Sequence, residues 1–108
     1  MYYLIKNLEI SSAHCLRLDY DSKCKNIHGH NWNIIIFCKN KELNHNGMVI
    51  DFNDIKEIVM QLDHDNINNY IEQPTAENIA KYLCEKIPFC YKVKVVESKN
   101  NIVIYEKV

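Results

Sequence analysis

No stretch of the 108-residue sequence is apolar for long enough to cross a lipid bilayer, which argues against a helical membrane protein. The first residues, Met1 to Lys6, lack the charged, apolar and small-residue zones of a signal peptide, so we expect the protein to stay in the cytosol (cytoplasmic). An excess of positive charge is also missing, because 13 Lys and Arg stand against 14 Asp and Glu. Without a basic surface the chain has no general attraction for nucleic acid, and we expect neither nucleic acid nor membrane as a partner.

The number of cysteines is five and therefore odd, which does not suit a disulfide framework. Cys38, Cys84 and Cys90 fall within or beside apolar segments, where a free thiol behaves as a small hydrophobic group. Apolar residues make up 47% of the chain and charged residues 25%, close to the averages for globular proteins. The length leaves room for one domain, residues 1–108, without a linker.

The most informative stretch holds two histidines two residues apart, in Cys24-Lys25-Asn26-Ile27-His28-Gly29-His30. It leads into the apolar segment Trp32 to Phe37, which is typical of a strand. Since successive side chains alternate between the faces of a strand, His28 and His30 point the same way. A third histidine, His14, ends another strand-like segment. Three neutral imidazoles at one point are the ligand set of a catalytic zinc with an open fourth position, whereas a His-x-His pair alone also occurs as two surface residues.

Four segments have the composition or alternation of strands: residues 2–12, 31–39, 91–97 and 102–106. The segment 15–27 between the first two strands has no apolar repeat, so we expect it to form a loop. A turn at 98–101 makes a hairpin of the last two strands.

Between the two pairs of strands the apolar residues recur at the spacing of a helix. The first such stripe consists of Ile55, Ile58, Val59 and Leu62. It predicts a helix of about eleven residues, with Asp51 or Asn53 as its N-cap. The second helix opens at Pro74 and Thr75, with Thr75 as the natural N-cap, and ends at Pro88.

The order strand, strand, helix, helix, strand, strand predicts an α+β domain, a four-stranded antiparallel sheet with two helices on one face. Such a sheet has two open edges, and open edges pair readily with other chains. A homo-oligomer joined edge to edge is the simplest expectation.

Six motifs resemble, in order, those of the 6-pyruvoyltetrahydropterin synthase family: Ser12-Ala13-His14, Cys24-x3-His28-Gly29-His30-Asn31, Val49-Ile50-Asp51-Phe52, Leu62-Asp63-His64, Pro74-Thr75-Ala76-Glu77-Asn78 and Val96-Glu97-Ser98. The three-residue gap between Cys24 and His28 is similar to the branch that makes 6-carboxytetrahydropterin for queuosine. The chain departs from the family pattern at Ile10, where an aromatic residue is common, and in a trimmed final hairpin. The resemblance implies a tunnelling fold, in which the sheets of a trimer or hexamer join into a barrel with active sites between subunits.

The resemblance also implies the chemistry. The family substrate is 7,8-dihydroneopterin triphosphate, which loses triphosphate and, in this branch, also acetaldehyde by cleavage of a carbon–carbon bond. A zinc on the three histidines would be the electrophile, Cys24 the base, and His64, oriented by Asp63, a second proton carrier. Each residue also has an ordinary explanation: Cys24 as a loop thiol, and the Asp63-His64 pair as the flank of a helix. Asp65 is an alternative carboxylate to orient His64.

Three further residues complete the implied site. Glu97 shares a strand face with Val93 and Val95, where an ionised carboxylate is unfavourable unless it is paired. The family uses its matching glutamate to accept two parallel donors of the pterin ring. Thr75 and Glu77 suit the cap and first turn of the second helix, and a pterin contact is the alternative. Two other functions stay open, namely the pyruvoyl-forming reaction and a protein of the same fold that binds a pterin or purine without turnover.

Overall fold

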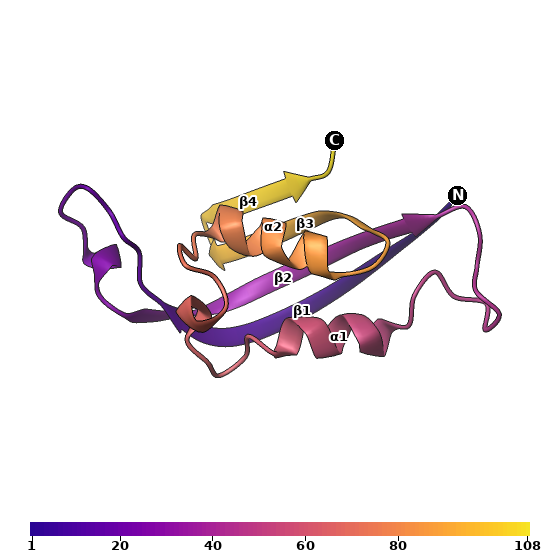
Figure 1. The fold of residues 1–108 in the computed structure, drawn as a ribbon, viewed down its shortest axis with the longest axis horizontal. Coiled ribbons are helices and arrows are strands. Elements are labelled where there is room, and N and C mark those ends of the chain that lie inside the picture. Colours follow the sequence, from indigo (N-terminus) through magenta and orange to yellow (C-terminus); the bar gives the residue numbers. More distant parts are fainter.

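The computed structural model describes residues 1–108, which form one four-stranded sheet and two helices (Figure 1). The strands and helices are, in chain order, β1 (Tyr2–His14), β2 (His28–Asn40), α1 (Phe52–Met60), α2 (Ala76–Lys86), β3 (Cys90–Ser98) and β4 (Asn101–Glu106). The order across the sheet is β1-β2-β3-β4, and each neighbouring pair is antiparallel. The predicted α+β class is confirmed, and no helix is both long and apolar enough to span a membrane.

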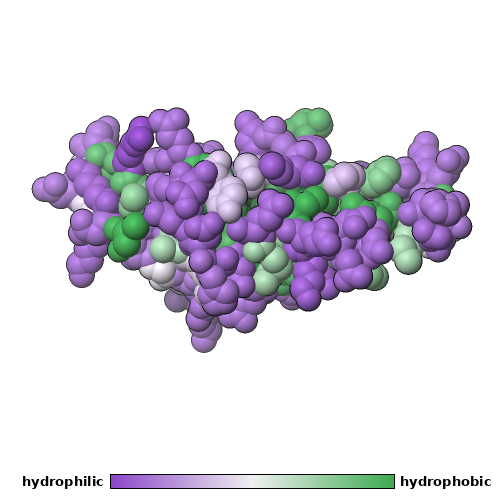
Figure 2. Space-filling model, turned by 60° about the horizontal axis from the view of Figure 1, so that its bottom comes forward, coloured by the Kyte–Doolittle hydropathy of each residue, from purple (hydrophilic) through white to green (hydrophobic).

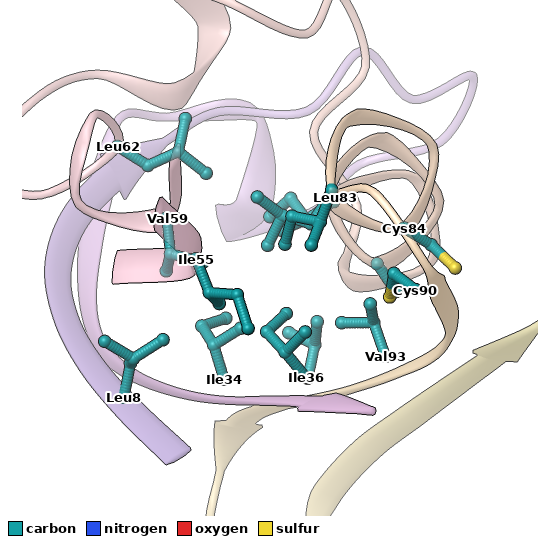
Figure 3. Packing of buried hydrophobic residues seen from close by; sticks show 14 of the residues in the cluster. Leu8, Ile34, Ile36, Ile55, Val59, Leu62, Leu83, Cys84, Cys90 and Val93 are labelled. Atoms are coloured by element: carbon teal, nitrogen blue, oxygen red, sulfur yellow. The ribbon is translucent and has the colours of Figure 1, made fainter. Parts of the chain in front are cut away.

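Both helices lie on the same face of the sheet, as the order of the predicted strands and helices indicated. In the strand register, Ile36 of β2 pairs with Val93 of β3, and both side chains are fully buried together with Ile34. Helix α2 covers β3 and β4, whereas α1 lies beside β1 (Figure 1). Figure 3 shows Ile55 of α1 and Leu83 of α2 pointing into the apolar layer that the strands line. Burial of one such side chain stabilises the fold by about 1.5–3 kcal/mol relative to leaving it exposed.

Side-chain caps start both helices at the positions that the sequence indicated. The Asp51 carboxylate accepts a hydrogen bond from the backbone N–H of Asn53, and the Thr75 hydroxyl accepts one from Asn78. Helix α1 has nine residues and is shorter than expected. Leu62, the last residue of its apolar stripe, is buried beyond the helix end, in a turn whose N–H groups bond back to α1.

The C-terminal half of β1 is not an open edge, which corrects the expectation of two free edges. The backbone N–H of His64 donates to the carbonyl of Ser11 at 2.7 Å, and that of Ala13 donates to the carbonyl of Asp65 at 3.1 Å. The Ser11 N–H in turn donates to the Asp63 carboxylate at 2.8 Å. Residues 62–66 therefore cover this half of the strand, which leaves the first half of β1 and the outer edge of β4 for pairing.

The face of the sheet without helices carries exposed apolar side chains near both edges. Tyr3 and Ile5 of β1 and Ile102 and Ile104 of β4 are each about half exposed or more. They alternate with residues of the buried face in the strand registers. Figure 2 shows that hydrophilic side chains cover most of one side of the molecule, with apolar groups exposed in patches between them.

Candidate metal centre and active site

The strand register brings three histidines together at one end of the buried face. His14, the last residue of β1, pairs directly with His28, the first residue of β2, and His30 lies two residues further on, opposite Ser12. All three side chains point to the helix-covered face, and their ring centres lie 4.5 to 5.2 Å apart. The His-x-His spacing predicted the shared face of His28 and His30. The antiparallel pairing of β1 with β2 brings His14 to the same place.

Backbone carbonyls fix the orientation of two of the rings. The Nδ1 atom of His14 lies 2.7 Å from the carbonyl oxygen of Pro74, and that of His28 lies 2.7 Å from the carbonyl oxygen of Asn26. A carbonyl only accepts, so each Nδ1 carries the proton and each Nε2 keeps a free lone pair. A hydrogen bond of this kind is the usual outer support of a metal-binding histidine.

Glu97 joins the histidines from the end of β3. Its Oε1 atom lies 2.9 Å from Nε2 of His30 and 3.7 Å from Nε2 of His14. One potential ligand atom from each of His14, His28, His30 and Glu97 lies within 4.8 Å of the other three. Three imidazoles and one carboxylate are a donor set that suits a divalent transition metal such as zinc, so the residues present fit a metal ion.

Burial favours the neutral, metal-binding form of His14 and His30. The side chain of His14 is only 1% exposed, and burial is the main cause that lowers its pKa. Burial also lowers the pKa of His30, against the opposing effect of the Glu97 charge. The Nε2 atoms of His14 and His30 are buried without a hydrogen-bond partner. A buried polar atom without a partner is unfavourable, and a bound metal would remove this penalty.

A layer of side chains beneath the cluster holds it in place. The ring of Trp32 packs edge-on against His14 and His30 at centre distances of 4.8 and 5.0 Å. Its indole N–H donates to the carbonyl of Ser12 at 3.2 Å, and the Ser12 hydroxyl donates to the carbonyl of Leu62. The site is thus built on the packed end of the core.

Cys24 lies in the loop between β1 and β2 and is not among the converging ligand atoms. Its carbonyl accepts a hydrogen bond from Leu16 at 2.8 Å, and its N–H donates to the Ser22 hydroxyl at 3.1 Å. The bond from Leu16 joins the two sides of the loop near the ends of both histidine-bearing strands, and the bond to Ser22 caps a local turn. The thiol is partly exposed and free.

Two side-chain amides that the sequence did not single out hold the start of this loop. Asn68 accepts from the N–H of Cys15 at 2.9 Å and donates to its carbonyl at 3.0 Å. Gln73 makes the same pair of bonds with the backbone of Arg17, at 2.8 and 2.7 Å. Each amide thereby satisfies the backbone N–H and carbonyl of one residue, as a neighbouring strand would do. The polar composition of 65–73 gave no local signal for this role.

The pair Asp63 and His64 lies on the segment that covers the edge of β1. His64 has a φ of 55°, a left-handed conformation that is uncommon outside glycine, and its side chain is 81% exposed. Its Nε2 atom lies 3.4 Å from Oδ2 of Asp63, whose other oxygen accepts from Ser11. His64 and His30 both line an open cavity of about 570 Å³.

Asp65 does not contact His64, although the sequence left that arrangement open. One of its oxygens accepts from the N–H of Asn66 and from the amide of Asn69, and the other accepts from the Tyr70 hydroxyl. These bonds, chiefly that from Asn66, lower the pKa of Asp65. Both oxygens therefore have partners already.

The last group of expected residues surrounds the start of α2. Glu77 and Glu97 line one cavity of about 280 Å³ together with Asn100 and Asn101. Thr75 caps the helix with its hydroxyl and does not line this cavity. Glu97 is the one residue that belongs both to this cavity and to the histidine cluster.

Comparisons with known proteins agree with this architecture. A Pyrococcus horikoshii protein, provisionally named a 6-carboxy-5,6,7,8-tetrahydropterin synthase, is 45% identical over 59% of this chain, and the match spans 43% of that protein's length. The human 6-pyruvoyl tetrahydrobiopterin synthase is 34% identical over 78% of this chain and 70% of its own.

The Caenorhabditis elegans 6-pyruvoyl tetrahydropterin synthase has a similar structure, with a TM-score of 0.76 at 27% identity over 99% of this chain and 96% of its own. The family model described as 6-pyruvoyl tetrahydropterin synthase matches residues 3–108, which is nearly the whole chain. The protein therefore belongs to the 6-pyruvoyl tetrahydropterin synthase family, as the six motifs had indicated.

Proposed function

We propose that this protein is a zinc-dependent lyase that converts 7,8-dihydroneopterin triphosphate to 6-carboxytetrahydropterin, with release of acetaldehyde and triphosphate, in queuosine biosynthesis. The observation that carries the proposal is the convergence of three histidine side chains, two of them oriented through Nδ1 by backbone carbonyls, in a chain of this family. The three-residue gap between Cys24 and His28 favours the carboxy-forming reaction over the pyruvoyl-forming one.

His14, His28 and His30 would hold the zinc through their Nε2 atoms. The bound ion would supply an electrophile that polarises oxygens of the substrate side chain. The chain contributes neutral imidazoles, because burial lowers the pKa of His14 and His30 and so keeps their lone pairs available. Trp32 beneath the rings limits their movement, so the ligands are ordered before the ion binds.

Two groups would move protons on the substrate side chain. Cys24 would act as the base, since its thiol is partly exposed on a loop whose base is fixed by hydrogen bonds. His64 would carry a second proton, with Asp63 holding the ring in one orientation. The contact between Asp63 and Ser11 supports this role, because it ties the carboxylate to the sheet.

We place the complete site between subunits of a homo-oligomer, a trimer or hexamer. Within one chain, His64 is almost fully exposed and its ring does not join the histidine cluster. The free half of β1 and the outer edge of β4 are available for pairing, and each carries exposed apolar residues on the face without helices. Edge-to-edge pairing would continue the sheet into a barrel and bring residues of two chains together.

The pterin ring would lie in the cavity between Glu77 and Glu97. The ring presents its amino group and an adjacent ring N–H as two parallel donors, which one carboxylate can accept together. Glu97 is only 26% exposed and lines this cavity, which supports such a contact. Glu77 and Thr75, at the start of α2, would contribute secondary contacts to the ring or would serve only in the cap and first turn of the helix.

The pyruvoyl-forming reaction is the second candidate, and the similarity to the Caenorhabditis elegans and human proteins of that name favours it. Product analysis separates the two. Zinc-loaded protein is incubated with 7,8-dihydroneopterin triphosphate, and the pterin product and acetaldehyde are quantified. We expect 6-carboxytetrahydropterin and acetaldehyde in equal amounts. A pyruvoyl product without acetaldehyde would establish the second candidate, and bound but unchanged substrate would identify a non-catalytic binding protein.

A further inference from the structure

One carboxylate serves two neighbouring sites in this structure. Glu97 places Oε1 at the histidine cluster, and the same side chain lines the cavity in which we place the pterin ring. Glu77 lines that cavity too, but it is not part of the histidine cluster. A carboxylate has only two oxygens, so the contacts that Glu97 makes at one site limit those it can make at the other.

The contacts of Glu97 with the histidines are those of ligands around a shared centre. Oε1 lies 2.9 Å from Nε2 of His30, yet the Nε2 atoms of His14 and His30 are without a hydrogen-bond partner. The contact between the two atoms therefore lacks the geometry of a hydrogen bond. Ligand atoms of a tetrahedral site with bonds of 2.0 to 2.2 Å lie about 3.4 Å apart. The observed separations of 2.9 and 3.7 Å fall on either side of that value.

We propose that Glu97 is the fourth ligand of the metal in the substrate-free protein, and that it leaves the metal when a pterin ring enters the neighbouring cavity. This inference rests on the proposed function, because it takes the metal site and the ring cavity from there. It adds that the coordination position used by the substrate is closed by the chain itself until the ring binds.

The two roles of Glu97 exclude each other. To accept both parallel donors of the ring, the carboxylate must turn both oxygens toward the cavity, which removes Oε1 from the histidines. Ring binding then opens a position on the metal and raises the net positive charge of the site by one. The binding of ring and metal must therefore oppose each other, and by linkage each lowers the affinity of the other by the same factor.

Cobalt(II) provides the probe, since it occupies nitrogen and oxygen sites of this kind and its visible absorption reports the coordination. Metal-stripped wild-type protein is titrated with Co²⁺ alone and in the presence of unsubstituted pterin, which lacks the side-chain oxygens of the substrate. We expect pterin to weaken Co²⁺ binding by about tenfold and to change the visible spectrum, and bound Co²⁺ to weaken pterin binding by the same factor.

Glu97→Gln tests the carboxylate, and Glu77→Gln is the matched control from the same cavity. Loss of the carboxylate in Glu97→Gln should weaken Co²⁺ binding by about 10- to 100-fold and abolish the coupling to pterin. Glu77→Gln should keep the Co²⁺ affinity and spectrum of the wild type. Thermal melting of each variant checks that it is folded. If Glu97→Gln does not fold, the effect of pterin on Co²⁺ binding to the wild-type protein tests the inference by itself.

The outcomes separate this inference from the proposed function. A wild type that binds no metal contradicts both. Metal binding that is unchanged in Glu97→Gln, or strengthened by pterin in the wild type, overturns the role of Glu97 as a ligand and leaves the three-histidine site intact. A spectral change with pterin that persists in Glu97→Gln would mean that the ring itself coordinates the metal, which also overturns the inference.

Discussion

The residues of the candidate site come from two regions that hold their side chains in different ways. His14, His28 and His30 lie on paired strands above Trp32, and their positions are set by the strand register and packing. His64 lies on the segment 62–66, with a left-handed backbone and a side chain that is 81% exposed. The first region is complete within one chain. The second has its backbone fixed against β1, but the His64 side chain is mostly exposed and contacts Asp63 and no member of the histidine cluster, which is why we place the site between subunits.

Removal of a strand-held ligand should have the largest effect. We expect His28→Ala to lose its metal on dialysis, from about one zinc per chain, and to lose activity, because the two remaining imidazoles, even together with Glu97, hold the ion more weakly than the full ligand set. The helices should stay folded, since His28 lies at the start of β2 and outside the apolar core. Metal analysis after dialysis and circular dichroism measure both effects.

His45→Ala is the matched control, because His45 is exposed in the turn before α1 and lies outside the cluster. It should keep metal and activity. If His28→Ala retains a full complement of metal, the strand-held histidines are not the site.

A substitution in the loop between β1 and β2 should have a smaller effect, which lowers turnover and leaves metal binding unchanged. We expect Cys24→Ala to retain its metal and to lower turnover by roughly one hundred- to ten-thousand-fold, the usual contribution of a positioned proton-transfer group. Cys15→Ala, in the same loop, should leave turnover near the wild-type value. Metal analysis alongside the activity assay identifies the alternative: loss of zinc in Cys24→Ala would make this thiol a ligand.

Mixing two inactive variants tests whether the two regions meet across a subunit boundary. His28→Ala and His64→Ala each damage one region only. If every site combines the histidine cluster of one chain with His64 of another, mixed oligomers should recover activity at about one site in four. The mixture is unfolded, refolded together and assayed beside each variant refolded alone. A mixture as inactive as its components would place both regions of each site in the same chain.

Local sequence patterns predicted the fold class and the shared face of His28 and His30 because both depend on short-range geometry. Alternation along a strand places His28 and His30 on one face whatever the chain does elsewhere. Thr75 was recognised as a cap because its hydroxyl acts within its own helix turn. Fold class followed from the order of such segments.

Other features depend on contacts between distant residues, which no local pattern shows. The pairing of His14 with His28 is set by a register across a 13-residue loop, and the Nδ1 partner of His14 is the carbonyl of Pro74, 60 residues away. The amide contacts of Asn68 with Cys15 are of the same kind. Glu97 was expected to face inward, but its proximity to His30 follows only from the pairing of β2 with β3.

The smallest predicted effect concerns the acid stability of the strand-held region without metal. Burial lowers the pKa of His14 and His30 from the ordinary value of 6.5, so the unfolded chain binds protons that the folded chain does not. The free energy of unfolding should then be highest above pH 6.5 and should decrease as the pH falls through that value toward the lowered pKa values. Thermal melting of chelator-treated protein, from about pH 7.5 to about pH 5.5, measures the slope.

His14→Gln, whose side chain does not titrate, should flatten this dependence of stability on pH. Reloading the wild type with zinc should extend stability to lower pH, because the ion competes with protons for the same nitrogens. A melting temperature that stays constant or rises toward acid pH would show that the buried histidines are charged in the folded protein, and that their protonation does not oppose folding.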